Sequence, residues 1–167
     1  MTQVDVRPVP EEIMPHLFSC VGMIIVSWTF LENTIDAIVA IAFHDHGGDV
    51  VSTKLPKQFS TKTAFSKRCC EELQSLSEFK PEILYLVEKA EELARTRHYV
   101  AHGVLTEFDP ADASFVFLKI DTTADKRQHV IGHMRILGTA LVKAGTDVKD
   151  LAKQGQSLTQ RLLGEKA

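Results

Sequence analysis

The first part of the chain contains an uninterrupted apolar repeat, which limits the possible folds more than any other feature. From about Pro10 or Pro15 to the Gly47–Gly48 pair, apolar residues recur at alternating spacings of three and four, the period of an amphipathic helix. Further apolar side chains, including Ile25 and Phe30, fall outside this stripe. Such a helix needs more than one packing partner, either at the centre of a monomeric bundle or in an oligomer interface. The stripe consists of Leu17, Val21, Ile24, Trp28, Leu31, Ile35, Ile38 and Ala42.

The composition is that of a globular chain. Its 167 residues are 44% hydrophobic and 25% charged, enough to bury a core, so we expect one domain over residues 1–167. A net charge of −3 argues against a strongly basic nucleic-acid coat but permits a local basic patch. The three cysteines (Cys20, Cys69 and Cys70) have no CxxC spacing, which favours neither a disulfide framework nor a cysteine zinc site and is typical of a reducing cytoplasm.

The same apolar segment bears on membrane insertion. Its longest apolar run, from Leu17 to Leu31, is short for a span that needs about 20 residues. The residues before it include Asp5, Glu11 and Glu12 rather than the basic region of a signal peptide. We therefore expect no signal peptide, no membrane helix and a cytoplasmic location.

Two more helices are predicted in the middle of the chain. Ser60 or Thr61 is a candidate N-cap for a helix that runs to about Leu76. Pro81 suits the first turn of the next helix and Gly103 suits its end.

The C-terminal part is predicted to contain a hairpin and a long helix. Residues 104–108 and 114–120 are rich in β-branched and aromatic residues and flank a Pro/Asp turn. Apolar residues from Val130 to Leu162 keep one helical phase, so the last helix is expected to begin after residues 122–125. The predicted fold is all-α, a four- to five-helix bundle with a small β-hairpin inserted before the last helix.

Between Val50 and Cys70, all charged side chains are basic, and they form a candidate RNA-binding track. A solvated helix face explains the same residues. They are Lys54, Lys57, Lys62, Lys67 and Arg68.

The end of the third predicted helix concentrates arginine and histidine. Arg97 lies within about 40° of the centre of this helix's apolar stripe, His98 borders the same face, and His102 falls where the helix stops. Free carbonyls at a helix C-terminus favour cationic side chains. Arginine presents a planar fork of donors to phosphate, and histidine exchanges protons near neutral pH. These residue types suit phosphodiester cleavage without a metal.

Arg97-His98-x-x-x-His102 resembles the R-x4-6-H signature of the HEPN superfamily, and Arg95 also fits the permitted spacing. The Ala-His-Gly sequence that ends at Gly103 and the Trp28-x-x-x-Glu32 pattern are similar to this group as well. The resemblance implies an all-α homodimer in which two motifs face one cleft. It also implies a metal-independent endoribonuclease of toxin, phage-defence or RNA-processing type that requires no cofactor.

The roles that this resemblance implies are specific. His102 is the general acid and base, and Arg97 binds the scissile phosphate, with His98 and Arg95 in support. Attack by the 2′-hydroxyl of RNA yields a 2′,3′-cyclic phosphate and a 5′-hydroxyl. An antitoxin or a nucleotidyltransferase is a possible class of partner protein. The alternative is a non-catalytic HEPN-like module that binds nucleic acid or a partner protein.

Two other interpretations of these residues stay open. In a structural one, Arg97 forms a salt bridge with Glu32 or Asp36 and His102 caps the helix. In a metal-binding one, His98 and His102 join His129 and His133, each pair one turn apart on a helix, with His44-Asp45-His46 as a further candidate set.

Overall fold

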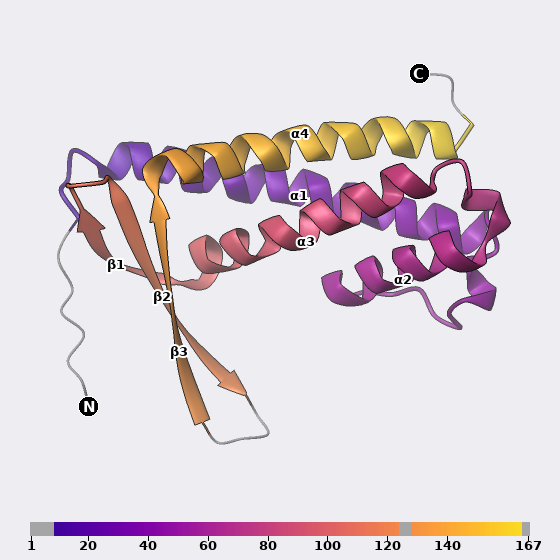
Figure 1. The fold of residues 1–167 in the computed structure, drawn as a ribbon, viewed down its shortest axis with the longest axis horizontal. Helices are drawn as coiled ribbons and strands as arrows, with labels where there is room; N and C mark the ends of the chain where they lie inside the picture. The colour runs from indigo at the N-terminus through magenta and orange to yellow at the C-terminus, as the bar shows by residue number, and fades with distance from the viewer. Residues whose placement is uncertain (1–8, 124–127, 165–167) are drawn as a thin grey trace. The chain divides into compact units, whose positions relative to one another are not determined.

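The computed structural model describes residues 9–123 and 128–164, except for the side chains of residues 121–123 and 128–130. The chain is mainly helical, with four α-helices and a three-stranded antiparallel sheet inserted before the last helix (Figure 1). This confirms the predicted fold class and the position of the β insertion. The helices are α1 (Met14–His44), α2 (Phe59–Glu72), α3 (Lys80–His102) and α4 (Gly138–Leu162), with short 3₁₀ turns at Gly48–Val50 and Gln74–Leu76.

Helix α1 follows its sequence pattern closely. All members of the predicted stripe are buried except Val21, which is partly buried. The helix ends before Gly47, whose φ of 83° lies in the left-handed region that glycine adopts without strain. At Gly48 the reason for glycine is close approach, because a Cβ would lie 2.7 Å from the carbonyl oxygen of Ala42.

Helices α2 and α3 differ from prediction at their ends. Helix α2 begins at Phe59 with Gln58 as its N-cap, so neither Ser60 nor Thr61 caps it, and the Thr61 hydroxyl instead donates to the Gln58 carbonyl at 2.8 Å. It stops at Glu72, before the predicted Leu76. Helix α3 has Pro81 in its first turn and ends just before Gly103, as expected.

The sheet is larger than the predicted hairpin. Strands β1 (Val104–Asp109), β2 (Ser114–Thr123) and β3 (Gln128–Leu137) form a meander in which β2 is central. The prediction that the last helix starts after residues 122–125 is therefore wrong. The described side chains of β3 alternate between exposed and partly buried, with Met134 and Ile136 on the same face, and β3 pairs with β2 along ten residues.

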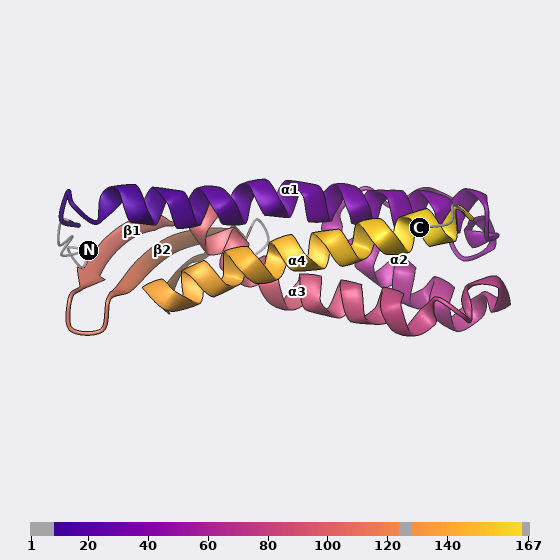
Figure 2. The same ribbon diagram turned by 90° about the horizontal axis from the view of Figure 1, so that it is seen from above.

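The chain divides into two compact units. Unit 1 comprises residues 1–25 and 94–146, and unit 2 comprises residues 26–93 and 147–167. The expectation of a single domain stays a prediction. The core of unit 1 joins the start of α1, the end of α3, β2 and the start of α4, and Figures 1 and 2 show β1 and β2 beside the first turns of α1. It contains Leu17, Cys20, Ile24, Val100, Phe115, Phe117, Leu141 and Ala144.

Unit 2 is a packed set of helices. In it the ring of Trp28 on α1 lies 5.2 Å from that of Phe59 on α2, measured between centroids. Helix α4 approaches closely at Gly155, where a Cβ would lie 2.5 Å from Thr34 Cγ2 and 3.0 Å from Leu86 Cδ1. The absence of a side chain at Gly155 therefore permits this packing.

Among the described residues, α1 is the one helix long and apolar enough to cross a membrane by length and composition. A buried core helix meets the same criteria, and 33% of the most apolar 18-residue window is buried inside the structure. The cytoplasmic location stays a proposal.

Candidate catalytic site at the end of α3

The last two turns of α3 are fixed against the sheet of unit 1 by one apolar side chain. Val100 is buried in the core of this unit, and Tyr99 packs against that core. The buried face thus reaches Val100, whereas the next residue, Ala101, is exposed. Because Val100 anchors the helix, neighbouring positions on other faces remain accessible to solvent.

The two motif histidines lie side by side on one of these faces. Their ring centroids are 5.2 Å apart and their planes are inclined by 64°, an edge-to-face arrangement. His102 is exposed and His98 is partly buried. The structure therefore brings His98 and His102 together as their spacing of four residues predicts.

A cationic side chain from the sheet joins the histidines. The Lys119 ammonium on β2 lies within hydrogen-bonding distance of His98 Nε2. An ammonium has donors but no acceptor, so Nε2 must accept this bond and the proton of a neutral His98 must be on Nδ1. Sequence reasoning missed Lys119, although its position continues the inward alternation of Phe115 and Phe117.

Two glycines allow the end of α3 to approach the sheet this closely. Gly132 pairs with Lys119 across β2 and β3, and a Cβ at Gly132 would lie 2.4 Å from the Tyr99 hydroxyl oxygen. A Cβ at Gly103 would lie 2.5 Å from the Tyr99 carbonyl oxygen and 3.3 Å from Phe117 Cβ. Gly103 is therefore explained by close contact, since its φ is not in the left-handed region.

The motif arginines differ in their surroundings. Arg95 is exposed, whereas Arg97 is partly buried with its Nε atom inaccessible to solvent. Glu32 and Asp36, the carboxylates that a structural interpretation assigns to Arg97, form ion pairs with Lys62 in unit 2. The Glu32 carboxylate also accepts a hydrogen bond from the Trp28 indole at 3.1 Å.

The predicted basic track lies in unit 2 and is largely neutralised. Lys62 is buried between Glu32 and Asp36, which counts against Lys62 as a phosphate ligand. Two other members form ion pairs: Lys67 with Glu91 at 2.7 Å, and Arg68 with Glu72 at 3.1 Å. Lys54 and Lys57 are exposed.

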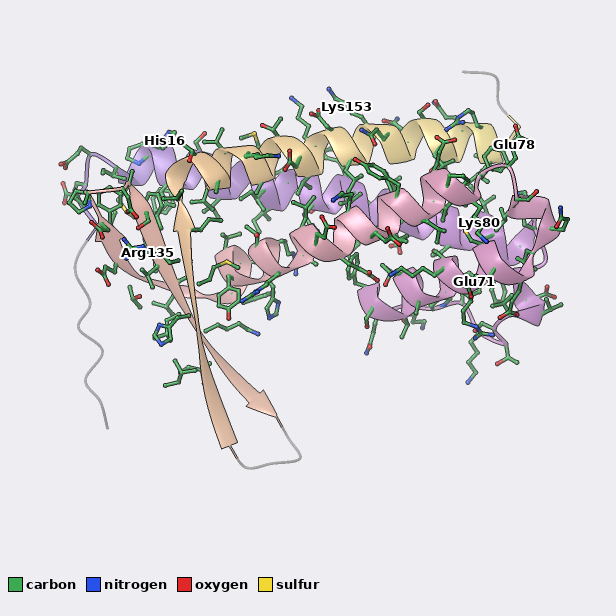
Figure 3. All side chains as sticks on the ribbon, viewed as in Figure 1. His16, Glu71, Glu78, Lys80, Arg135 and Lys153 are labelled. Atoms are coloured by element: carbon green, nitrogen blue, oxygen red, sulfur yellow. The ribbon has the colours of Figure 1, made fainter. Side chains whose placement is uncertain are left out.

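Other charges on the sheet of unit 1 form a separate cluster. Figure 3 labels Arg135 on the sheet. Its guanidinium lies 2.5 Å from an Asp109 oxygen and 3.1 Å from an Asp112 oxygen at the β1–β2 turn. The Ala111 amide, followed by the Arg135 guanidinium, lowers the pKa of Asp109. This cluster joins the turn to β3.

The metal-binding interpretation loses its second histidine pair. His129 and His133 lie on strand β3, where residues four apart are separated by about 13 Å, so they do not share a metal as a helical pair would. Among the side chains that the structure describes, which exclude those of residues 121–130, no three histidine, cysteine or carboxylate groups form a metal-binding group.

Comparisons of the chain with protein-family models, curated proteins and solved structures find no match.

Proposed function

We propose that the chain is an RNA-directed HEPN-like protein that cleaves RNA without a metal, using the end of α3 as its catalytic site. The observation that carries this proposal is the adjacent pair of imidazoles at an accessible helix end, with the Lys119 ammonium beside them. Imidazole transfers protons near neutral pH, and fixed cations stabilise the charge of a phosphoryl transition state.

The proposed reaction needs only the RNA and these side chains. The exposed His102 imidazole removes the proton from a 2′-hydroxyl, and the 2′-oxygen attacks the adjacent phosphorus. The bond from phosphorus to the 5′-oxygen breaks, and the His102 imidazolium returns its proton to that oxygen. The products are a 2′,3′-cyclic phosphate and a 5′-hydroxyl end. The Arg97 guanidinium binds the non-bridging oxygens, and Lys119 orients His98 beside His102.

A cleavage assay in EDTA tests the activity directly. The protein is incubated with single-stranded and structured RNA, alongside Arg97→Ala and His102→Ala. His133→Ala is a matched control, because His133 is an exposed histidine of the same unit on the opposite face of β3 from Gly132. We expect cleavage by the wild type and the control and about a 100-fold or greater loss in the two site variants.

Two further arms separate the alternatives. RNA with a 2′-deoxynucleotide at the cleaved position should resist the enzyme, because the nucleophile is missing. Equal RNA degradation by all four proteins would refute the catalytic proposal. RNA binding without any cleavage would refute catalysis and support the alternative, a non-catalytic module that binds nucleic acid.

The proposal includes a homodimer whose two motifs face one cleft. Light scattering should then give about 37 kDa, twice the chain mass of 18.6 kDa. A monomer at assay concentration would contradict this part. An antitoxin or nucleotidyltransferase partner and a cytoplasmic location belong to the same proposal.

A further inference from the structure

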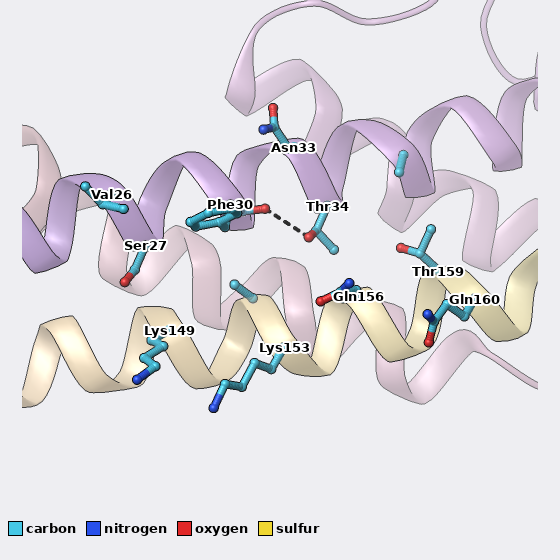
Figure 4. Close-up of a pocket in the computed structure, with 12 residues that line it drawn as sticks. Val26, Ser27, Phe30, Asn33, Thr34, Lys149, Lys153, Gln156, Thr159 and Gln160 are labelled. Atoms are coloured by element: carbon cyan, nitrogen blue, oxygen red, sulfur yellow. Dashed lines mark hydrogen bonds between the residues drawn. The ribbon is translucent and has the colours of Figure 1, made fainter. Parts of the chain in front are cut away.

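Unit 2 contains a groove whose lining residues have no role in the proposed reaction. It runs between residues 26–37 of α1 and residues 149–160 of α4 and has a volume of about 660 Å³ (Figure 4). At about 1.5 Å per residue, each wall is roughly 17 Å long, the length of three helical turns.

The α1 side of the groove combines three polar residues with apolar side chains, two of which are widely open to solvent. Phe30 is 64% exposed and Val26 is 58% exposed, both large values for apolar side chains on a helix. Ala37 and Ala152 extend this apolar lining. The hydroxyl of Thr34 donates to the Phe30 carbonyl at 2.9 Å, so its hydrogen is used within the helix. Contiguous exposed apolar surface of this kind marks interaction sites.

The charge of the groove is opposite to that of the chain. Lys149 and Lys153, one turn apart on α4, line the groove and extend from α4 away from α1 (Figure 4). No Asp or Glu is among the lining residues of this described groove. The carboxylates of Glu32 and Asp36 on the same part of α1 are paired with Lys62 instead. A protein of net charge −3 thus presents a groove with exposed apolar side chains on α1 and two lysines along its outer α4 edge.

We propose that this groove binds an acidic amphipathic helix of a partner protein. Helices bind in such grooves through apolar side chains at i, i+3 or i+4, and i+7, which span about 10 Å, so a helix with one further apolar turn matches the groove walls. Here those side chains would cover Val26 and Phe30, and flanking carboxylates would pair with Lys149 and Lys153. The inference does not depend on the proposed ribonuclease activity.

Two other occupants fit the groove less well. A second copy that paired groove to groove would place the lysines of one chain against those of the other without supplying a carboxylate. Single-stranded RNA binds through several aromatic platforms and a cationic track, whereas this lining offers Phe30 as its one aromatic residue and two lysines.

The test uses the full chain labelled with ¹⁵N and synthetic peptides of about 14 residues. The probe peptide carries leucine at i, i+3, i+7 and i+10 with glutamate on the flanks, and its control replaces every glutamate with lysine. Saturable amide shifts confined to residues 26–37 and 149–160 are expected with the acidic peptide alone.

Variants then assign the contacts. Lys149→Gln/Lys153→Gln should weaken the acidic peptide about tenfold, and Phe30→Ser should do the same. Gln154→Glu/Ser157→Glu is the matched control, since it also lowers the net charge by two on exposed α4 positions outside the groove, and it should bind normally. Circular dichroism verifies the fold of each variant.

Three results would overturn the proposal. The acidic and basic peptides could produce equal shifts or none, an RNA oligonucleotide could produce the groove shifts instead, or Lys149→Gln/Lys153→Gln could dissociate a dimer in light scattering. Cleavage at the end of α3 is measured separately, through Arg97→Ala and His102→Ala, so failure of the groove proposal is distinguishable from failure of the ribonuclease proposal.

Discussion

The same substitution, glycine to alanine, is predicted to have opposite effects on stability at two helix positions. At Gly22 on α1, a Cβ would meet no atom within 4 Å. Alanine there should raise the free energy of unfolding by roughly 0.5–1 kcal/mol, because glycine loses more backbone entropy in a helix. At Gly155 the same gain is opposed by the 2.5 Å approach to Thr34 Cγ2 and the 3.0 Å approach to Leu86 Cδ1.

The steric cost of the added methyl group at Gly155 follows from ordinary contact distances. Carbon atoms pack at about 3.5–4.0 Å, so the new methyl group would overlap Thr34 Cγ2 by about 1 Å. Overpacking of this kind costs about 1–3 kcal/mol, so the net loss for Gly155→Ala should be about 1 kcal/mol. For a chain of this length 1 kcal/mol corresponds to a change in Tm of about 2–4 °C.

Urea unfolding followed by circular dichroism measures both effects. Adding Thr34→Ser to Gly155→Ala should recover part of the loss, because serine lacks Cγ2 and keeps the hydroxyl. The same serine in the wild-type background should not stabilise the protein. The reasoning is refuted if both alanines stabilise the chain, or if Thr34→Ser has equal effects in the two backgrounds.

Three further predictions follow from the pKa shifts and the site. Burial raises the pKa of Cys69 to about 12 and that of Cys70 to about 11, so neither thiol should react with Ellman's reagent at pH 8 until urea unfolds the chain. Because the pKa of Asp109 is lowered on folding, its stabilising contribution is present above its unfolded pKa and is lost as the pH falls through its folded pKa. Arg135→Ala should make the free energy of unfolding depend less steeply on pH between about pH 5 and pH 2. An unchanged pH dependence in this range would contradict the role of Arg135 in lowering the pKa of Asp109. Lys119→Met should shift the histidine tautomer equilibrium in ¹⁵N spectra and reduce RNA cleavage, whereas unchanged spectra would remove Lys119 from the site.

Local signals predicted the helices well and the third strand poorly. The apolar repeat of α1 identifies the buried face of the helix because the spacing recurs over many turns. Residues 128–137 are ambiguous, since Val130, Met134 and Leu137 fit a helical period while Met134 and Ile136 fit a strand. The deciding factor is pairing with β2 along ten residues, and no local pattern encodes that pairing.

In the candidate site, too, contacts within one helix were predictable from the sequence, whereas contacts between elements were not. The contact between His98 and His102 follows from helix geometry and was predictable. The contact between His98 and Lys119 depends on how β2 lies against the end of α3, which the order of residues does not specify. The burial of Lys62 was also unpredictable, because its lysine spacing is equally typical of a solvated face, and only the packing of α2 on α1 places it between two carboxylates.

The close approach of the Tyr99 phenol to Gly132 links two positions that are 33 residues apart in the chain. Each position therefore constrains the other: a homologue that gains a methyl group at position 132 must either shift the aromatic side chain at position 99 or lose its hydroxyl. Such a pair should co-vary, with tyrosine accompanied by glycine and smaller residues accompanied by alanine or serine. Substituting positions 99 and 132 together should preserve stability better than substituting Gly132 alone.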